Sequence, residues 1–97
     1  MRYDFEWDRE KARRNHRKHR VTFEQSATVF RDPKAASLYD EEHSEMEERW
    51  ITLGISSNSG LLVVHHTFEE IDGGHVRVRI FSCRKATQDE IRQYGEQ

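Results

Sequence analysis

The amino-acid sequence predicts one α+β domain, residues 1–97, with two N-terminal helices and a C-terminal helix packed on one face of a mainly antiparallel sheet. Alternating apolar residues predict the strands, and glycine-containing turns between strands predict hairpins. Two segments with capping-box spacing predict the starts of helices. A chain of 97 residues can hold one hydrophobic core and has no room for a second.

The composition leaves little apolar surface for that core, since 34% of the residues are hydrophobic and 35% are charged. The free energy gained by burying apolar surface should therefore exceed the cost in conformational entropy by only a little. We therefore expect a bound partner to stabilise the chain. The single cysteine, Cys83, excludes an intramolecular disulfide, and no cysteine pair suggests a zinc site. No segment resembles a signal peptide or a membrane span, so we expect a cytoplasmic protein.

The charges are separated along the chain, although the net charge is only −2. The segment 9–20 holds seven Lys or Arg residues and one Glu, whereas the segment 40–48 holds six acidic residues and no Lys or Arg. This separation offers a basic surface to a polyanion and an acidic segment to a different contact.

The first strand is expected over residues 3–8, where aromatic and acidic residues alternate. Asp8 is a suitable N-cap for a helix over residues 9–20. A helical wheel places small and polar residues on one narrow face of this helix: Lys11, Ala12, Asn15, Lys18 and His19. The opposite face is cationic and contains Arg9, Arg13, His16, Arg17 and Arg20.

A second helix is expected from Thr22, because Thr22 and Gln25 have capping-box spacing. Asp32 and Pro33 should end this helix. The segment 35–39 is interpreted as a short edge strand that leads into an acidic loop.

Three further strands are expected over residues 48–56, 61–70 and 75–83, with turns at 56–60 and 71–74. Apolar residues alternate in the first and third of these strands, and the second is apolar almost throughout. Thr87 and Glu90 have capping-box spacing and predict a final helix through Tyr94.

Basic residues lie on and just after the last strand. Arg77 and Arg79 share one face of it, and Arg84 and Lys85 follow. Two neighbouring cations repel each other unless an anion lies between them, so either a bound phosphate or carboxylates from a neighbouring strand satisfy them. The spacing alone leaves both alternatives open, although Arg suits bidentate contact with a phosphoryl group.

The histidines do not form a metal site by spacing. His65 and His66 point to opposite faces of a strand, so at most one of them faces the core. His16 and His19 have helical i, i+3 spacing, but no third ligand has motif spacing. No metal or other cofactor is expected.

Taken together, these segments resemble the BrnT family of type II toxins over nearly the whole chain. The matching segments are FEWD (5–8), KARRNHRKHRVTFEQSATVF (11–30), HSEMEERWITLG (43–54), LLVVHHT (61–67), RIFSCRKAT (79–87) and EIRQY (90–94). The family pattern Lys-Ala-x-x-Asn-x-x-Lys-His matches the narrow face of the first predicted helix. Arg20 stands where the family usually has Gly, so this position is expected to accept left-handed geometry with some strain or to end the helix differently. Cys83 stands where Ala is common.

The resemblance implies a fold related to RelE-type ribonucleases and RNA cleavage without a metal. It also implies neutralisation by a BrnA-like antitoxin with a ribbon-helix-helix DNA-binding module. The pair would repress its own operon, contacting operator DNA only through the antitoxin, and a heterotetramer is one assembly open to it. No membrane contact is implied.

The resemblance also suggests site residues. Arg79 and Arg84 are expected to stabilise the charge that develops on phosphorus, with Lys85 assisting. Lys18, His19 and Glu48 are the candidates for proton transfer, and Arg49 is expected to orient one of them.

The sequence is also compatible with two other functions. In the first, the chain is a non-catalytic antitoxin-binding partner that acts in autorepression of the operon. The second, a general DNA-binding domain, has less support, because the segment 9–20 has few Asn or Gln side chains that could read bases.

Overall fold

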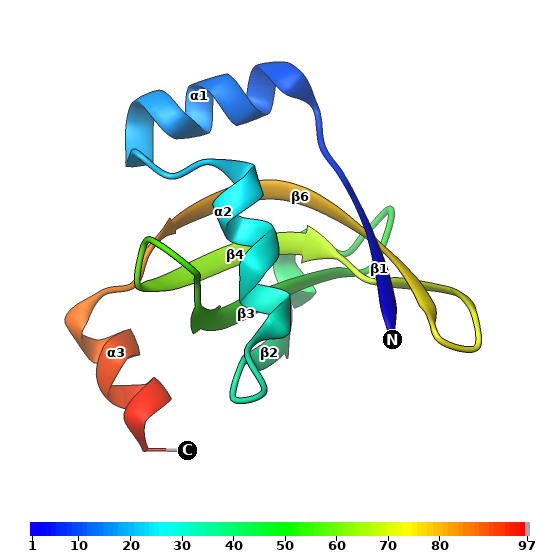
Figure 1. Cartoon of the computed structure of the whole chain (residues 1–97). Coiled ribbons are helices and arrows are strands. Elements are labelled where there is room, and N and C mark those ends of the chain that lie inside the picture. Colours follow the sequence, from blue (N-terminus) through cyan, green and yellow to red (C-terminus); the bar gives the residue numbers. More distant parts are fainter. Residues whose placement is uncertain (97) are drawn as a thin grey trace.

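The structure is a computed structural model that describes residues 1–96. Within these residues the chain is an α+β domain with three α-helices and a mixed six-stranded sheet (Figure 1). The strands are β1 (Arg2–Glu6), β2 (Ala36–Tyr39), β3 (Arg49–Ile55), β4 (Leu61–Thr67), β5 (Glu69–Asp72) and β6 (His75–Lys85). The helices are α1 (Arg9–His19), α2 (Phe23–Ala27) and α3 (Gln88–Gly95), with 3-10 turns η1 (Thr28–Arg31) and η2 (Glu41–His43).

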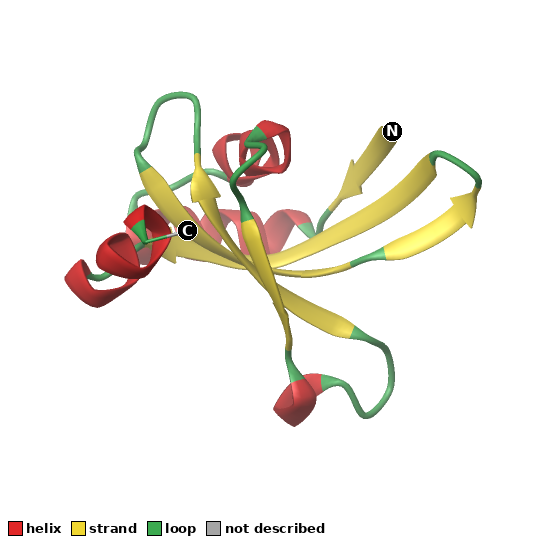
Figure 2. Cartoon of the chain, turned by 90° about the horizontal axis from the view of Figure 1, so that it is seen from below, coloured by secondary structure: helices red, strands yellow, loops and turns green. Residues whose placement is uncertain are grey.

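Strand β6 connects the parts of the sheet. Residues 75–79 pair in parallel with β1 at one edge, and residues 75–77 pair antiparallel with β5 at the other. Residues 80–85 pair antiparallel with β4, and the sheet continues through β3 to β2. Figure 2 shows the twist of these strands across one another. The hairpins follow the predicted turns, whereas the parallel pairing of β1 was not predicted.

Helix α1 covers the edge of β6 at the point where β1 ends. The side-chain amide of Asn15 donates to the carbonyl oxygen of Cys83 (2.8 Å) and accepts from the Cys83 N–H (3.0 Å). The same amide donates to the carbonyl oxygen of Val21 (3.2 Å). Asn15 therefore replaces the neighbouring strand that this part of β6 lacks, because its amide group has the donor and the acceptor of a peptide bond.

The helices are arranged differently from the single layer that the sequence predicted. Helix α2 and the turn η1 lie over one face of the sheet, α1 lies along the edge of β6, and α3 lies beyond its end (Figure 1). Tyr94 of α3 donates to the carboxylate of Asp32 (2.6 Å), which also accepts from the Ile55 N–H at the end of β3 (2.8 Å). Helix α3 is therefore attached at a corner of the sheet.

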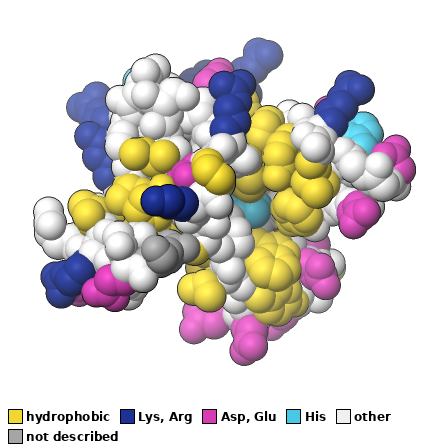
Figure 3. All heavy atoms as spheres, turned by 60° about the horizontal axis from the view of Figure 1, so that its bottom comes forward, with side chains coloured by type: hydrophobic (Ala, Val, Ile, Leu, Met, Phe, Trp, Pro, Cys, Tyr) yellow, Lys and Arg dark blue, Asp and Glu magenta, His cyan; other side chains and the backbone are white. Residues whose placement is uncertain are grey.

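The core lies between α2 and the sheet. Its buried apolar residues come from α2 and the residues just before it, from η1, and from strands β4 and β6: Val21, Phe23, Val29, Leu62, Val64, Val76, Val78, Ile80 and Cys83. Gly54 allows the close approach of η1, because a Cβ atom there would lie 2.7 Å from Cγ1 of Val29. Aromatic side chains at the edge of this core, such as Tyr3, Phe5 and Phe30, are only partly buried. Hydrophobic side chains gather on part of the molecular surface (Figure 3). None of the helices in residues 1–96 has the length and apolar character needed to cross a membrane.

The predicted helix starts are confirmed. The Asp8 carboxylate accepts from the N–H of Lys11, and both capping boxes, at Thr22 and at Thr87, are complete. Several predicted elements differ in detail. Strand β1 ends at Glu6 and not at residue 8, β6 continues to Lys85, and the first half of the turn predicted over residues 71–74 belongs to β5. The second helix continues after Ala27 as the 3-10 turn η1, and the strand predicted over residues 61–70 is interrupted at Phe68.

Arg20 ends α1 in the left-handed conformation, with φ 60° and ψ 29°. Its N–H donates to the carbonyl oxygen of His16. The left-handed geometry considered from the sequence is therefore present, and a residue with a Cβ atom occupies a conformation that glycine adopts at lower cost.

Replacing Asn15 by alanine should lower the free energy of unfolding by about 2–4 kcal/mol, because three buried backbone groups lose their partner. Chemical denaturation measures this change. The matched control is Lys18→Ala, an exposed position on the same helix, which should change stability by less than about 0.5 kcal/mol. Equal effects of the two substitutions would contradict the role given to Asn15.

Replacing Arg20 by glycine should raise the free energy of unfolding by roughly 0.5–1 kcal/mol, because it relieves the left-handed strain. Thermal denaturation tests this expectation. Lys18→Gly, inside α1, should instead destabilise the protein by about 1 kcal/mol. A loss of stability with Arg20→Gly would show that the strain is negligible.

Candidate functional site

Three cations from three different elements surround one aromatic ring on the face of the sheet opposite α2. Measured to the centre of the Phe81 ring, Cζ of Arg49 lies at 4.1 Å, Cζ of Arg79 at 5.2 Å and Nζ of Lys11 at 5.2 Å. These distances are within the range of cation–π attraction. We call Lys11, Glu47, Arg49, Arg79 and Phe81 the Phe81 cluster.

The fold brings these side chains together from distant parts of the sequence. Arg79 and Phe81 lie on one face of β6, since side chains alternate along a strand. The pairing of β4 with β6 shifts register next to Phe81, between the partners of Ser82 and Ile80. Arg49 is the first residue of β3, and Lys11 lies in the first turn of α1, where Asp8 caps the helix.

Glu47 supplies the negative charge of the cluster. Its carboxylate accepts from Nη2 of Arg79 at 2.6 Å and from Nη2 of Arg49 at 3.5 Å. Ser44 holds the loop that presents Glu47, because its hydroxyl accepts from the Arg49 N–H (3.0 Å). The cluster therefore has three positive charges against one negative charge, so a second anion would be attracted to it.

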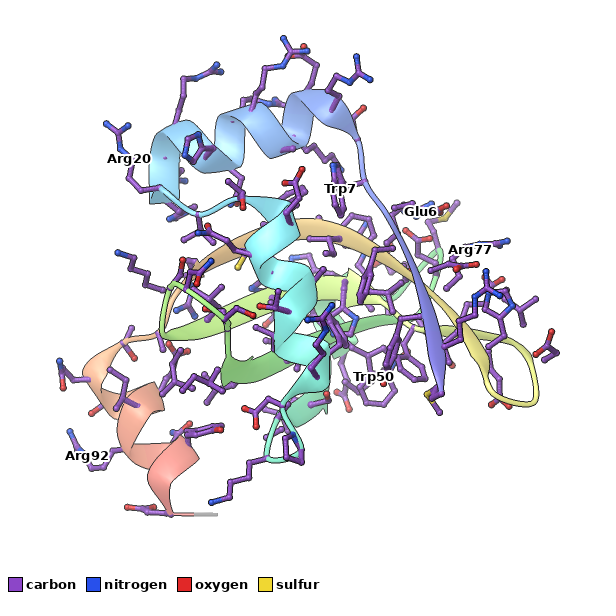
Figure 4. All side chains as sticks on the ribbon, in the orientation of Figure 1. Glu6, Trp7, Arg20, Trp50, Arg77 and Arg92 are labelled. Atoms are coloured by element: carbon purple, nitrogen blue, oxygen red, sulfur yellow. The ribbon has the colours of Figure 1, made fainter. Side chains whose placement is uncertain are left out.

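Two cavities meet at Glu47 and Arg79, and they differ in charge. The larger, about 330 Å³, is mainly acidic and is lined by Glu6, Glu47, Glu48, Thr67, Phe68, Glu69, Arg77 and Arg79. Glu6 and Arg77 lie close together at its β1 side (Figure 4). The smaller, about 180 Å³, has three cations against two carboxylates among its lining residues Asp8, Lys11, Glu47, Arg49, Arg79, Ile80 and Phe81. The smaller cavity is therefore the better place for an anion.

Arg79 and Arg84 do not converge on one anion, as the sequence analysis expected. Arg84 forms a bidentate ion pair with Glu90 of α3, at 2.8 and 2.9 Å, whereas Arg79 pairs with Glu47. The two arginines are five residues apart along β6, and each has a carboxylate of its own. Lys85 is exposed at the end of β6. The carboxylates that the sequence left as an alternative to phosphate are therefore present.

The other residues proposed from the sequence lie at different distances from the cluster. Arg49 belongs to it, and Glu48 is exposed, lines the larger cavity and has no ion pair within residues 1–96. Lys18 and His19 are about two helical turns beyond Lys11 on α1, with Lys18 exposed and His19 half-buried. Among the described residues, no hydrogen bond, ion pair or cation–π contact joins either of them to the cluster.

Sequence reasoning missed Lys11, Glu47 and Phe81 as site residues. Lys11 had a usable signal, since it is the first residue of the narrow face of α1. No signal in the sequence pointed to Glu47 or Phe81. The position of Glu47 depends on a loop, and that of Phe81 depends on the register shift between β4 and β6.

His66 has a structural place in the core. Its Nδ1–H donates to the carbonyl oxygen of Thr67 (2.8 Å), so Nε2 accepts from the hydroxyl of Thr52 (2.6 Å), which in turn accepts from Ser37 (2.7 Å). Burial lowers the pKa of His66 to about 4, so the ring is neutral near neutral pH. His65 is half-buried on the opposite face. Within residues 1–96, no three His, Cys, Asp or Glu side chains are grouped so that they could hold a metal ion.

Comparison with known protein families gives a match over most of the chain. The sequence model of a family described as "Ribonuclease toxin, BrnT, of type II toxin-antitoxin system" matches residues 7–90. This range includes every member of the Phe81 cluster. No curated protein matches the chain.

Replacing Glu90 by glutamine should lower the free energy of unfolding by about 1 kcal/mol near neutral pH, since it removes the partner of Arg84 and keeps a capping-box residue. The hydrogen bonds from Arg84 lower the pKa of Glu90 from 4.5 to about 2. The contribution of the ionised Glu90 is therefore fully present above pH 4.5 and is lost as the pH falls towards 2. Denaturation of both proteins across this range should show their difference shrinking. A difference that does not depend on pH would exclude the ion pair as its cause.

Proposed function

The chain belongs to the BrnT family of ribonuclease toxins of type II toxin-antitoxin systems. On this premise we propose that it is a metal-independent endoribonuclease with a RelE-like fold, which cuts RNA in the cytoplasm and so inhibits translation. The observation that supports this proposal most directly is the Phe81 cluster, where three cations face one small cavity.

The cluster has the charge that RNA cleavage requires. When a 2′-hydroxyl attacks the adjacent phosphorus, negative charge builds up on the phosphate oxygens. Fixed cations at those oxygens stabilise the transition state, and one well-placed donor is worth about a hundredfold to a thousandfold in rate. We assign this role to Arg79 and Arg49, which are held against Phe81, with Lys11 beside them. These residues would supply the charge that a metal ion supplies in other nucleases.

The proton transfers need a base and an acid. We assign the base to Glu48, whose exposed carboxylate lines the larger cavity and has no ion pair within residues 1–96. Glu48 would accept the proton of the 2′-hydroxyl as its oxygen bonds to phosphorus. Lys11 would donate a proton to the 5′ oxygen as the bond from phosphorus to that oxygen breaks. The products are a 2′,3′-cyclic phosphate and a free 5′-hydroxyl. Lys18 and His19 are further from the cluster, which makes them weaker candidates.

Glu47 competes with the substrate in this proposal. Its carboxylate occupies the guanidinium of Arg79, where a phosphate oxygen would bind. RNA must therefore displace Glu47 or share Arg79 with it.

The family implies a protein antitoxin. We propose that it is a BrnA-like protein with a ribbon-helix-helix module, that operator DNA is contacted only through it, and that toxin and antitoxin form a heterotetramer. The low apolar content of the chain supports a bound partner.

One observation favours the alternative of a non-catalytic antitoxin-binding partner. Both Arg79 and Arg84 hold carboxylates of this chain rather than an open anion site. In that alternative the two ion pairs are structural, and the toxin family fold serves only to hold the antitoxin in a repressor.

Expression without antitoxin should arrest growth, and the purified protein should cleave RNA in the presence of EDTA. Arg79→Ala and Arg49→Ala should each reduce the cleavage rate at least about a hundredfold. The matched control is Arg92→Ala, which removes an arginine of α3 that pairs with Asp89 and lines neither cavity. Arg92→Ala should keep nearly full activity. Thermal denaturation of each variant checks that it is folded.

The same experiment separates the two functions. A wild-type protein that neither arrests growth nor cuts RNA, but represses with its antitoxin, would establish the non-catalytic alternative. Cleavage that EDTA abolishes would contradict the metal-independent mechanism.

A further inference from the structure

Arginines are paired very differently in α1 and in the rest of the molecule. Outside the segment 9–20, every arginine of residues 1–96 except Arg31 forms an ion pair with an Asp or Glu. Inside that segment only Arg13 does so, with Glu10 of the same helix. The chain has more acidic than basic residues, so a shortage of carboxylates does not explain this difference. The first helix is left with an uncompensated positive charge.

Part of this charge lies next to the Phe81 cluster. Lys11, Arg14 and Lys18 have the spacing i, i+3 and i+7, which places them on one flank of α1. The contact of Lys11 with Phe81 shows that this flank borders the face of β6 that holds the cluster. The helix is held in this orientation by the bonds from Asn15 to Cys83.

Helix α1 and the second half of β6 run side by side in the same direction (Figure 1). The flank of α1 therefore follows the strand from Phe81 towards Lys85. We call the surface between them, with Lys11, Arg14 and Lys18, the α1–β6 seam. Arg20, at the end of the helix, points away from the sheet (Figure 4).

We propose that the α1–β6 seam binds the backbone of single-stranded RNA on one side of the cleavage position. This inference rests on the proposed function, since the Phe81 cluster is taken as the position of the cut phosphate. From Lys11 to Lys18 the helix rises about 10 Å, so the three cations of the flank are spread along the direction of β6. One cation for each turn of the helix suits a chain of regularly spaced phosphates.

The chemistry of the flank favours RNA over a protein partner. All three side chains of the flank are long cations, and Arg14 and Lys18 are exposed. No apolar side chain lies between them on this flank, whereas the centre of a protein interface is depleted in charge and rich in aromatic residues. Phosphate contacts need no such apolar centre.

The test measures binding of an RNA of about twelve nucleotides with 2′-O-methyl riboses, which lacks the attacking hydroxyl and stays intact. The flank variant is Arg14→Ala/Lys18→Ala, and the matched control is Arg13→Ala/Arg17→Ala, on the outer face of the same helix. Both variants remove two positive charges from exposed positions of α1. The unfolding midpoint of each variant confirms that it is folded.

The flank variant should bind this RNA at least about tenfold more weakly than the wild type at moderate salt. The plot of log affinity against log salt concentration should become shallower by about 1.4, or about 0.7 for each lost phosphate contact. The outer-face variant should change the slope by less than half of this amount. Equal effects of the two variants, or no binding by the wild type, would overturn the inference.

Two further outcomes separate this inference from its premise. If the wild type binds the modified RNA through the flank but does not cleave unmodified RNA, the seam is supported and the proposed function fails. If the flank variant loses neutralisation by the antitoxin while its affinity for RNA is unchanged, the seam is a protein-docking surface and the inference is wrong.

Discussion

The structure depends on how the second half of β6 is completed at its open edge. In its first half β6 has β1 as a neighbour, but β1 ends at Glu6, and the backbone of Cys83 then needs another partner. Asn15 supplies one, because a single primary amide can donate to a carbonyl and accept from an N–H at the same time. A small domain with few apolar residues relies on such contacts, since each buried backbone group left without a partner costs about 1–3 kcal/mol.

The same contact sets the position of the cations. Once Asn15 is attached to β6, the helical repeat places Lys11 one turn earlier, over the ring of Phe81. Arg49 and Arg79 approach that ring from the sheet, and Glu47 reduces their mutual repulsion. Fold and site therefore share one constraint: the edge that must be covered for stability is covered by the helix that brings a cation to the site.

Local features could be predicted from the sequence, and features that depend on distant contacts could not. The caps at Asp8, Thr22 and Thr87 use partners three residues away, and their spacing alone indicated them. Asn15 and Cys83 are 68 residues apart, so the sequence showed a narrow helical face without showing what it contacts. The separate pairing of Arg79 and Arg84 was also hidden, because it depends on carboxylates of other elements, Glu47 and Glu90.

The most direct measurement is a crystal structure of the protein with a dinucleotide whose 2′-hydroxyl is replaced by hydrogen, so that it cannot be cut. The account predicts that its phosphate lies in the smaller cavity, within hydrogen-bond distance of Arg79 and Arg49, and that Glu47 has moved from Arg79. A phosphate bound at Arg84 and Lys85, with the bond from Glu47 to Arg79 intact, would contradict it.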